Sequence, residues 1–307
     1  MGVYQLLVRR AFEALIVIWG VSTIVFGLLR ISGDPTLLMV PPGAPAEAIA
    51  LLRHQLGFDQ PLWVQYANFL WGLVRGDMGM SLIQGRPTME IVMERLPATM
   101  ELGGSALLLA LAVGCPIGIV SAVYRGSIFD RLGMFFAVLG QALPPFWLGL
   151  VLILFFSVRF RLLPPSGADS WQHLIMPCVT LAVLYMATFA RVTRSAYLEE
   201  SSKDYVRTAK AKGLSRSNVI IGHVLRNASI PLITMIALSL ANLLGGAVVT
   251  EAIFAWPGIG RLVVDAIAAR DYPLVQAVVL VGSIVYVLAS TAADLLYAVV
   301  DPRIRLK

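Results

Sequence analysis

Four carboxylates lie inside or beside long uncharged stretches of this sequence: Glu13, Glu101, Glu251 and Asp294. A carboxylate within a membrane helix is a candidate proton relay or substrate contact, because a charge is costly there. All four lie near the ends of their stretches, within reach of headgroups or loop arginines, which favours a role as interfacial anchors. Asp294 lies deepest and is the candidate for a functional intramembrane acid.

No other side chains are spaced for catalysis or for a metal. His54, His173 and His223 are far apart and lack the H-E-x-x-H or H-x₃-H spacing of metal sites. The sequence also has no Gly-x-Ser-x-Gly nucleophile elbow and no Gly-x₄-Gly-Lys-Ser/Thr phosphate loop. We therefore predict no catalytic, cofactor or metal site on this chain. If ATP drives the process in which this chain takes part, another subunit must bind that ATP.

The composition indicates which elements carry these side chains. Of the 307 residues, 58% are hydrophobic and 14% are charged, and the mean hydropathy is +0.80. Soluble domains carry about 25% charged residues, so a soluble enzyme is excluded. The net charge of +6 is interpreted as loop topology, because basic loops orient membrane proteins, and not as nucleic-acid binding.

Six stretches free of Asp, Glu, Lys and Arg are candidates for membrane crossing, which takes about 20 helical residues. They are residues 14–29, 102–124, 132–158, 170–190, 227–250 and 272–293. We expect an all-α membrane protein with six transmembrane helices, at 9–30 and at about 99–124, 132–158, 172–194, 228–250 and 272–298. Pro116, Pro144 and Pro145 predict kinks.

The basic residues predict the orientation. Residues 1–8, the short loop 124–131, the loop 195–227 and the tail 301–307 are expected on one face. Together with Arg9, Arg10, Arg191 and Arg194 at the adjoining helix ends, this face gathers 15 of the 24 Lys and Arg residues, including all four lysines. That face is then cytoplasmic. The long segment 31–98 and the loop 251–271 fall on the opposite face.

The segment 31–98 is too long for a simple connection. It opens with turn residues and continues with two short amphipathic helices, at about 46–56 and 61–75. The second helix carries Trp63, Tyr66, Phe69 and Trp71. Aromatic residues at this spacing are typical of anchoring at a membrane surface, and docking of a partner is the alternative.

The stretch 199–214 is the most informative in the chain. Val206, Ala209 and Lys210 fall on adjoining turns of a short helix, and Gly213 is placed to end it in a left-handed conformation. Ser215 and Asn218 can cap a second short helix that ends near Arg226 and Asn227. Such a basic helix either inserts into the groove of a partner or lies on anionic lipid, and the residues alone leave both possible.

These residues resemble a family. Arg207-Thr208-Ala209-x₃-Gly213 is similar to the Glu-Ala-Ala-x₃-Gly loop of membrane subunits of binding-protein-dependent ABC importers. Arg207 and Thr208 depart from that pattern, as they do in the dipeptide and oligopeptide branch, which also has counterparts of residues 204–213 and 223–228. Further matching fragments, in the same order along the chain, are residues 33–35, 56–61, 76–81, 251–260, 270–273 and 297–303.

The resemblance implies the first permease subunit of a dipeptide-type importer, with the type I ABC importer fold and a periplasmic segment after the first helix. Dipeptides, oligopeptides or glutathione are the expected substrates, and nickel permeases share the pattern. The residues that the resemblance assigns to an ATPase-coupling helix and its surroundings are Asp204, Tyr205, Arg207, Thr208, Ala209, Lys212, Gly213, His223, Arg226 and Asn227. Ala209 is expected to face the groove of the ATPase.

The expected partners are a second permease subunit, two ABC ATPase subunits that hold ATP and Mg, a periplasmic or lipid-anchored solute-binding protein, and membrane lipid. The chain itself would be a non-catalytic subunit in a bacterial inner membrane, with both termini in the cytoplasm. An ion-coupled secondary carrier is the alternative from another class, and it would require mid-span broken helices. A membrane-embedded enzyme would require convergent titratable groups.

Overall fold

The chain folds as a bundle of long helices. The computed structural model describes residues 3–31, 33, 36, 40 and 44–300, and only the backbone at 3–7, 240–246 and 296–300. The helices are α1 (Val3–Ile31), α3 (Ala46–Leu56), α4 (Leu62–Arg75), α5 (Thr88–Val123), α6 (Ile128–Ala142), α7 (Pro145–Leu152), the π-helical η1 (Ile153–Arg159), α8 (Trp171–Ser201), α9 (Asp204–Ala211), α10 (Arg216–Asn218), the π-helical η2 (Val219–Leu225), α11 (Arg226–Ile253), α12 (Ile259–Ala268) and α13 (Tyr272–Val300). Within the described part of the chain no strand forms, so the all-α prediction is confirmed.

Among the described residues, five helices are long and apolar enough to cross a membrane, and a sixth crossing results if the bent pair formed by 128–142 and 145–159 counts as one span. The two parts of that pair meet at 102°. The expected single helix 132–158 is therefore wrong. Pro144 and Pro145 explain the break, because neither can donate a backbone hydrogen bond to a continuing helix. The sequence predicted only a kink at these prolines, and the structure has a full break of the helix.

Two other helices extend beyond the ends that were predicted from the positions of charged residues. α5 begins at Thr88 and not near 99, and α8 continues to Ser201 and not 194. Charged residues end a membrane crossing but do not end a helix, because they are satisfied outside the lipid. Arg86, for example, pairs with Glu90 at 3.1 Å and Glu94 at 2.5 Å beside the first turns of α5.

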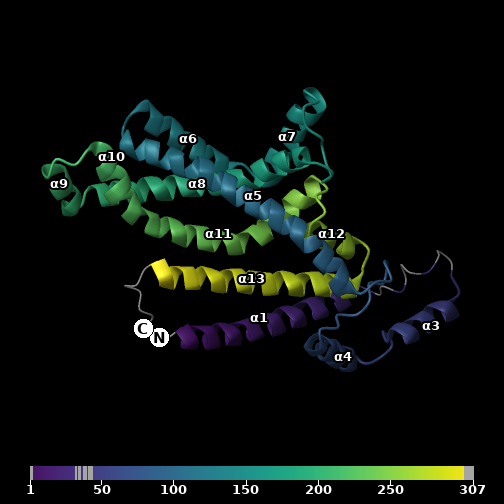
Figure 1. The fold of residues 1–307 in the computed structure, drawn as a ribbon. Helices are drawn as coiled ribbons and strands as arrows, with labels where there is room; N and C mark the ends of the chain where they lie inside the picture. Colours follow the sequence, from purple (N-terminus) through teal and green to yellow (C-terminus); the bar gives the residue numbers. More distant parts are fainter. Residues whose placement is uncertain (1–2, 32, 34–35, 37–39, 41–43, 301–307) are drawn as a thin grey trace.

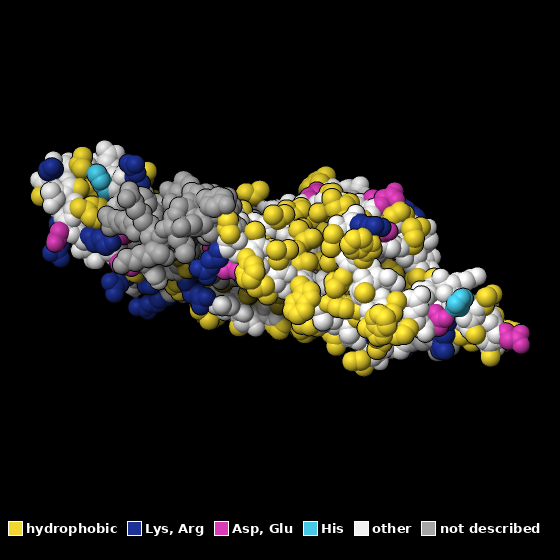
Figure 2. Space-filling view, turned by 90° about the horizontal axis from the view of Figure 1, so that it is seen from below, with side chains coloured by type: hydrophobic (Ala, Val, Ile, Leu, Met, Phe, Trp, Pro, Cys, Tyr) yellow, Lys and Arg dark blue, Asp and Glu magenta, His cyan; other side chains and the backbone are white. Residues whose placement is uncertain are grey.

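The elements sort to the two ends of the bundle. α9 and α10 lie at one end, where α1 begins and α13 ends, and α3, α4 and α12 lie at the other (Figure 1). Lys and Arg side chains gather at the α9 end, while hydrophobic side chains cover much of the face beyond it (Figure 2). The tail 301–307 and most of the turn residues expected at 33–45 lie outside the described residues.

The tightest helix contact joins α5 to α8. A Cβ on Gly114 would lie 2.7 Å from the carbonyl oxygen of Met186 and 3.1 Å from Cβ of Phe189. Only a glycine permits this approach, and close backbone packing is what holds membrane helices together. At the α9 end, Arg194 of α8 donates two hydrogen bonds to Asp130 of α6, at 2.7 and 2.9 Å.

We predict that Gly114→Ala destabilises the bundle, because its methyl group would meet a backbone oxygen that cannot move aside. Overpacking of this kind typically costs about 1–3 kcal/mol. Gly104→Ala, in the same helix, is the control, since nothing lies within 4 Å of its Cβ. Thermal unfolding in detergent should show a lower midpoint for Gly114→Ala and an unchanged or higher one for Gly104→Ala. Equal midpoints would contradict this account of the α5–α8 contact.

Candidate functional site

The short helix α9 stands at the basic end of the bundle and turns back sharply. It runs from Asp204 to Ala211, and Gly213 follows with φ +79°. The amide of Gly213 donates to the carbonyl of Lys210 at 3.0 Å, which closes the turn. The expected left-handed conformation of Gly213 is therefore confirmed. A residue with a Cβ would adopt this conformation only at a cost in free energy.

One face of α9 packs against its own chain. Val206 is 1% exposed and Ala209 is 7% exposed, and both join a cluster with Ala122 of α5 and Tyr197 of α8, completed by residues 219 and 224 of η2. The expectation that Ala209 faces the groove of a partner is therefore wrong. Its small side chain lets α9 lie close to the ends of two spanning helices.

Polar contacts fix α9 from both sides. The hydroxyl of Tyr205 donates to Glu200 Oε2 at 2.7 Å, and the side-chain amide of Asn227 donates to the Tyr205 oxygen at 3.1 Å. Burial raises the pKa of Tyr205. Lys203 pairs with the same Glu200, and this hydrogen bond raises the pKa of Lys203. Tyr205 and Asn227 thus hold α9 in place and tie it to α8 and α11.

The opposite face of α9 is open. The side chain of Asp204 is 95% exposed and that of Arg207 is 78% exposed, with 3.6 Å between Arg207 Nη1 and Asp204 Oδ1. The other exposed residues of the expected coupling set are Thr208, Lys212, Gly213, His223, Arg226 and Asn227. This mainly basic surface, and not the face that carries Ala209, is what a partner can contact.

The helix after α9 differs from expectation. Ser215 caps it as expected, accepting from the amide of Asn218 at 3.3 Å. It does not end near Arg226, because no residue there breaks the hydrogen-bonding pattern. The helical backbone continues through α10 and η2 into α11. α9 therefore rests on the extension of a spanning helix.

A second site, which the sequence did not reveal, lies at the far end of α11. Glu251 is fully buried, and its carboxylate accepts hydrogen bonds from Thr99 Oγ1 at 2.7 Å and from the amides of Gly260 and Arg261 at 2.8 and 3.1 Å. The expectation that Glu251 lies within reach of headgroups or loop arginine side chains is wrong. The first amides of a helix carry partial positive charge, so the N-terminus of α12 neutralises this carboxylate.

The glycines of the segment 256–260 make room for Glu251. A Cβ on Gly258 would overlap the carboxyl group of Glu251, and one on Gly260 would lie 2.5 Å from Cα of Val248. Trp256 adds a hydrogen bond from its indole nitrogen to the carbonyl of Ala98 at 2.8 Å. The two glycines, seven and nine residues after the glutamate, show in the sequence only as residues without side chains, and they do not by themselves indicate the partners of Glu251.

Asp294 pairs with Arg10 of α1, and Arg10 also contacts Glu13 at 2.7 Å. The side chain of Asp294 is 36% exposed. This geometry is that of an ion-pair contact between α1 and α13. A functional role for Asp294 stays a prediction. Glu101 is exposed on α5.

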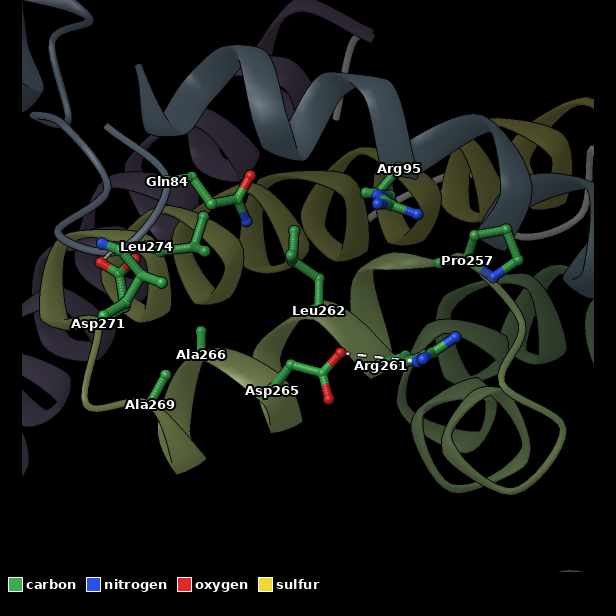
Figure 3. A pocket seen from close by; sticks show the side chains of 12 residues that line it. Gln84, Arg95, Pro257, Arg261, Leu262, Asp265, Ala266, Ala269, Asp271 and Leu274 are labelled. Atoms are coloured by element: carbon green, nitrogen blue, oxygen red, sulfur yellow. Dashed lines mark hydrogen bonds and ion pairs between the residues drawn. The ribbon is translucent and has the colours of Figure 1, made fainter. Parts of the chain in front are cut away.

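A polar pocket of about 260 Å³ lies beside α12 (Figure 3). Gln84 and Arg95 face α12 across the pocket, and Arg261 Nε lies 3.6 Å from Asp265 Oδ2 on the α12 side. Asp271 at its edge accepts from Ser81 at 2.5 Å and so holds the segment that carries Gln84. In the described part of the chain, no three His, Cys, Asp or Glu side chains converge as metal ligands.

Comparison with known sequences gives two family matches. Residues 114–306 match the "Binding-protein-dependent transport system inner membrane component" family, and residues 3–103 match "Binding-prot-dependent transport system membrane comp, N-term". The chain is 45% identical to the glutathione transport system permease protein GsiC of Salmonella typhimurium, over 94% of each chain. It is 40% identical to the dipeptide transport system permease protein DppB of Escherichia coli K12, over 99% of each.

The fold also has a solved counterpart. The MetNI methionine ABC transporter, crystallised in inward-facing conformations, contains a chain that matches this one with a TM-score of 0.59 at 19% identity. The match covers 69% of this chain and 97% of that chain. The expected fold of an ABC importer permease is thereby confirmed.

Glu251→Gln should destabilise the end of the bundle that carries α12. The amide would direct N–H groups at donors that now bond to a carboxylate, and an unsatisfied buried polar group costs about 1–3 kcal/mol. Glu101→Gln makes the same change on an exposed side chain and should leave stability unchanged. Hydrogen exchange of α12 amides would report the effect locally. Equal protection in both variants would refute the anchoring role of Glu251.

Proposed function

This chain belongs to the inner membrane components of binding-protein-dependent transport systems, and from that premise we propose that it is the permease subunit of an ATP-driven peptide importer. It would form half of the translocation pathway, and a sister permease would supply the other half. The observation that most supports this is the near full-length similarity to a glutathione permease and a dipeptide permease. Dipeptides, oligopeptides or glutathione are the proposed substrates, with nickel as the alternative within the same family.

The exposed face of α9 is proposed to dock on an ATPase subunit. Arg207 and Lys212 would meet acidic side chains of that subunit, and Thr208 would pack between them. Two ATPase subunits would bind ATP and Mg, so this chain would have no enzymatic activity of its own. Because the buried face of α9 packs on α5, α8 and η2, displacement of α9 would move those helices with it. ATP can then switch the bundle only if the ATPases bind its two states with different affinities.

The other end of the bundle is proposed to face the periplasm and to receive a solute-binding protein. Tyr66 and Phe69 of α4 pack on α1, with the Tyr66 hydroxyl 2.6 Å from Thr23 Oγ1 and the rings of Phe69 and Phe26 5.9 Å apart. Trp63 and Trp71 stay exposed and are available to lipid or to that partner. Both termini would lie in the cytoplasm. We propose no nucleic-acid partner.

An ion-coupled carrier is the second candidate, and the break between α6 and α7 is the feature that would favour it. The sequence has no Asp or Glu between Asp130 and Asp169. Asp130 itself lies in the first turn of α6, at the end of the broken span, and both of its oxygens accept from Arg194. The rest of the span offers no carboxylate to bind a coupling ion or a proton. We favour the ATP-driven importer.

Reconstitution in liposomes tests the proposed function. This chain alone should hydrolyse no ATP, whereas the complex with its sister permease, ATPases and binding protein should hydrolyse ATP and accumulate a labelled dipeptide or glutathione. Unlabelled peptides should compete and free amino acids should not. ATP hydrolysis by the isolated chain, or peptide uptake driven by an ion gradient without ATP, would contradict the proposal.

The docking face of α9 gives a second test. Arg207→Glu with Lys212→Glu should leave folding intact and lower uptake at least about tenfold, because like charges across an interface cost several kcal/mol. Ala209→Asp should instead unfold the α9 region, since it buries an unpaired charge, and Ala211→Asp, exposed on the same helix, is its matched control. Pull-down of the ATPases and limited proteolysis near residue 209 separate the two effects. Normal uptake by the double variant would refute the docking assignment.

A further inference from the structure

Arg30 is enclosed by aromatic rings at the end of α1. Its guanidinium carbon lies 4.8 Å from the ring centre of Phe26, 4.9 Å from that of Phe58 and 5.6 Å from that of Tyr272. These rings come from α1, from the turn between α3 and α4, and from the start of α13. The faces of aromatic rings attract a cation, so three separate elements converge on this one side chain.

The rings lie against the Arg30 guanidinium, and its Nε has no acceptor among the described residues. A guanidinium carries five N–H donors in its plane. Its Nε is buried without a hydrogen bond, and Arg30 makes no ion pair with any residue that the structure describes. Asp59, which also lines the cavity beside Arg30, accepts from His54 Nδ1 at 2.7 Å. A buried donor without an acceptor is costly, so this site is suited to an oxygen-rich anion.

A cavity of about 680 Å³ opens beside this guanidinium. Its lining is mainly apolar, with Phe26, Gly27 and Leu62, and it contains Arg53 as a second cation. Arg30 directly follows the uncharged stretch 14–29 of a spanning helix. A cation at that position lies at the depth of lipid headgroups. The cavity therefore combines cations and an apolar wall at the depth where the headgroup of a lipid meets its acyl chains.

We propose that this cavity binds the phosphate of a phospholipid from the outer leaflet. The phosphate oxygens accept in-plane hydrogen bonds from Arg30, a bidentate geometry that guanidinium groups favour. The glycerol and the first acyl carbons lie along Phe26, Gly27 and Leu62. The charge of Arg30 favours phosphatidylglycerol over a zwitterionic lipid. The bound lipid joins α1, α4 and α13 at the end of the bundle opposite α9, and this site is independent of the ATPase and of the transported solute.

Binding is measured on the delipidated full-length chain in detergent by native mass spectrometry, with short-chain phosphatidylglycerol as the probe. Arg30→Gln should weaken binding at least about tenfold, since a hydrogen bond to a charged group contributes of that order. Arg75→Gln is the matched control. Arg75 lies 4.6 Å from the ring centre of Trp71 on α4 and does not line this cavity, so binding should be unchanged.

A second variant separates binding from folding. Gly27 lines the cavity and has nothing within 4 Å of its Cβ, so Gly27→Leu should fill the cavity and exclude the lipid without disturbing Arg30. The thermal midpoint of the delipidated variant should equal that of the natural sequence, and added lipid should no longer raise it. Equal binding by the natural protein, Arg30→Gln and Gly27→Leu would overturn the proposal.

Two further ligands distinguish the source of the phosphate. Glycerol 3-phosphate carries the same group without acyl chains and should bind far more weakly. If it binds as tightly as the lipid, the site recognises a soluble phosphate and the lipid assignment is wrong. Phosphatidylethanolamine should bind more weakly than phosphatidylglycerol, and the reverse order would overturn the assignment of an anionic lipid to this cavity.

Discussion

The arrangement of the bundle at the α12 end depends on the burial of one carboxylate. Glu251 is removed from solvent completely, and a charge in that position is tolerated only if donors surround it. Those donors come from Thr99 on α5 and from the first amides of α12. Thr99 in turn accepts the amide of Ile259 at 2.9 Å, so three elements meet around one functional group. The glycines at 258 and 260 follow as a steric requirement of that meeting.

The α9 end is held by a different kind of contact. There, small apolar side chains and a shared tyrosine hydroxyl attach α9 to its own chain, and cations are left on the outside. Such a surface is suited to a partner that must bind and release, because exposed charges steer association without adding much to affinity. One end of the chain is thus built around a buried charge and the other around an exposed group of charges.

The sequence allowed the class of fold to be predicted, because the fold class depends on the order of apolar and charged residues. It also indicated α3, α4 and the turn at Gly213, where local patterns decide the structure. It did not indicate that Ala209 faces inward, because a short helix with one small and one basic face can dock either way.

The burial of Glu251 was missed for a related reason. Its partners lie in another helix and in backbone amides, and neither is visible in a pattern of residue types. The break at Pro144 was anticipated only as a kink, since proline marks a position and not an angle.

The helical path from Arg216 to Ile253 is continuous through η2 and Pro231, and moved as one body it would act as a lever. Its 38 residues, counted inclusively between those positions, span about 57 Å at 1.5 Å per residue. A rigid tilt of only about 5° around its middle would displace each end by about 2.5 Å in opposite directions over that length. A small displacement of the end that carries α9 would therefore move the end that carries Glu251 in the opposite direction. Opening on one side of the bundle and closing on the other then require no change in the internal hydrogen bonding of the lever.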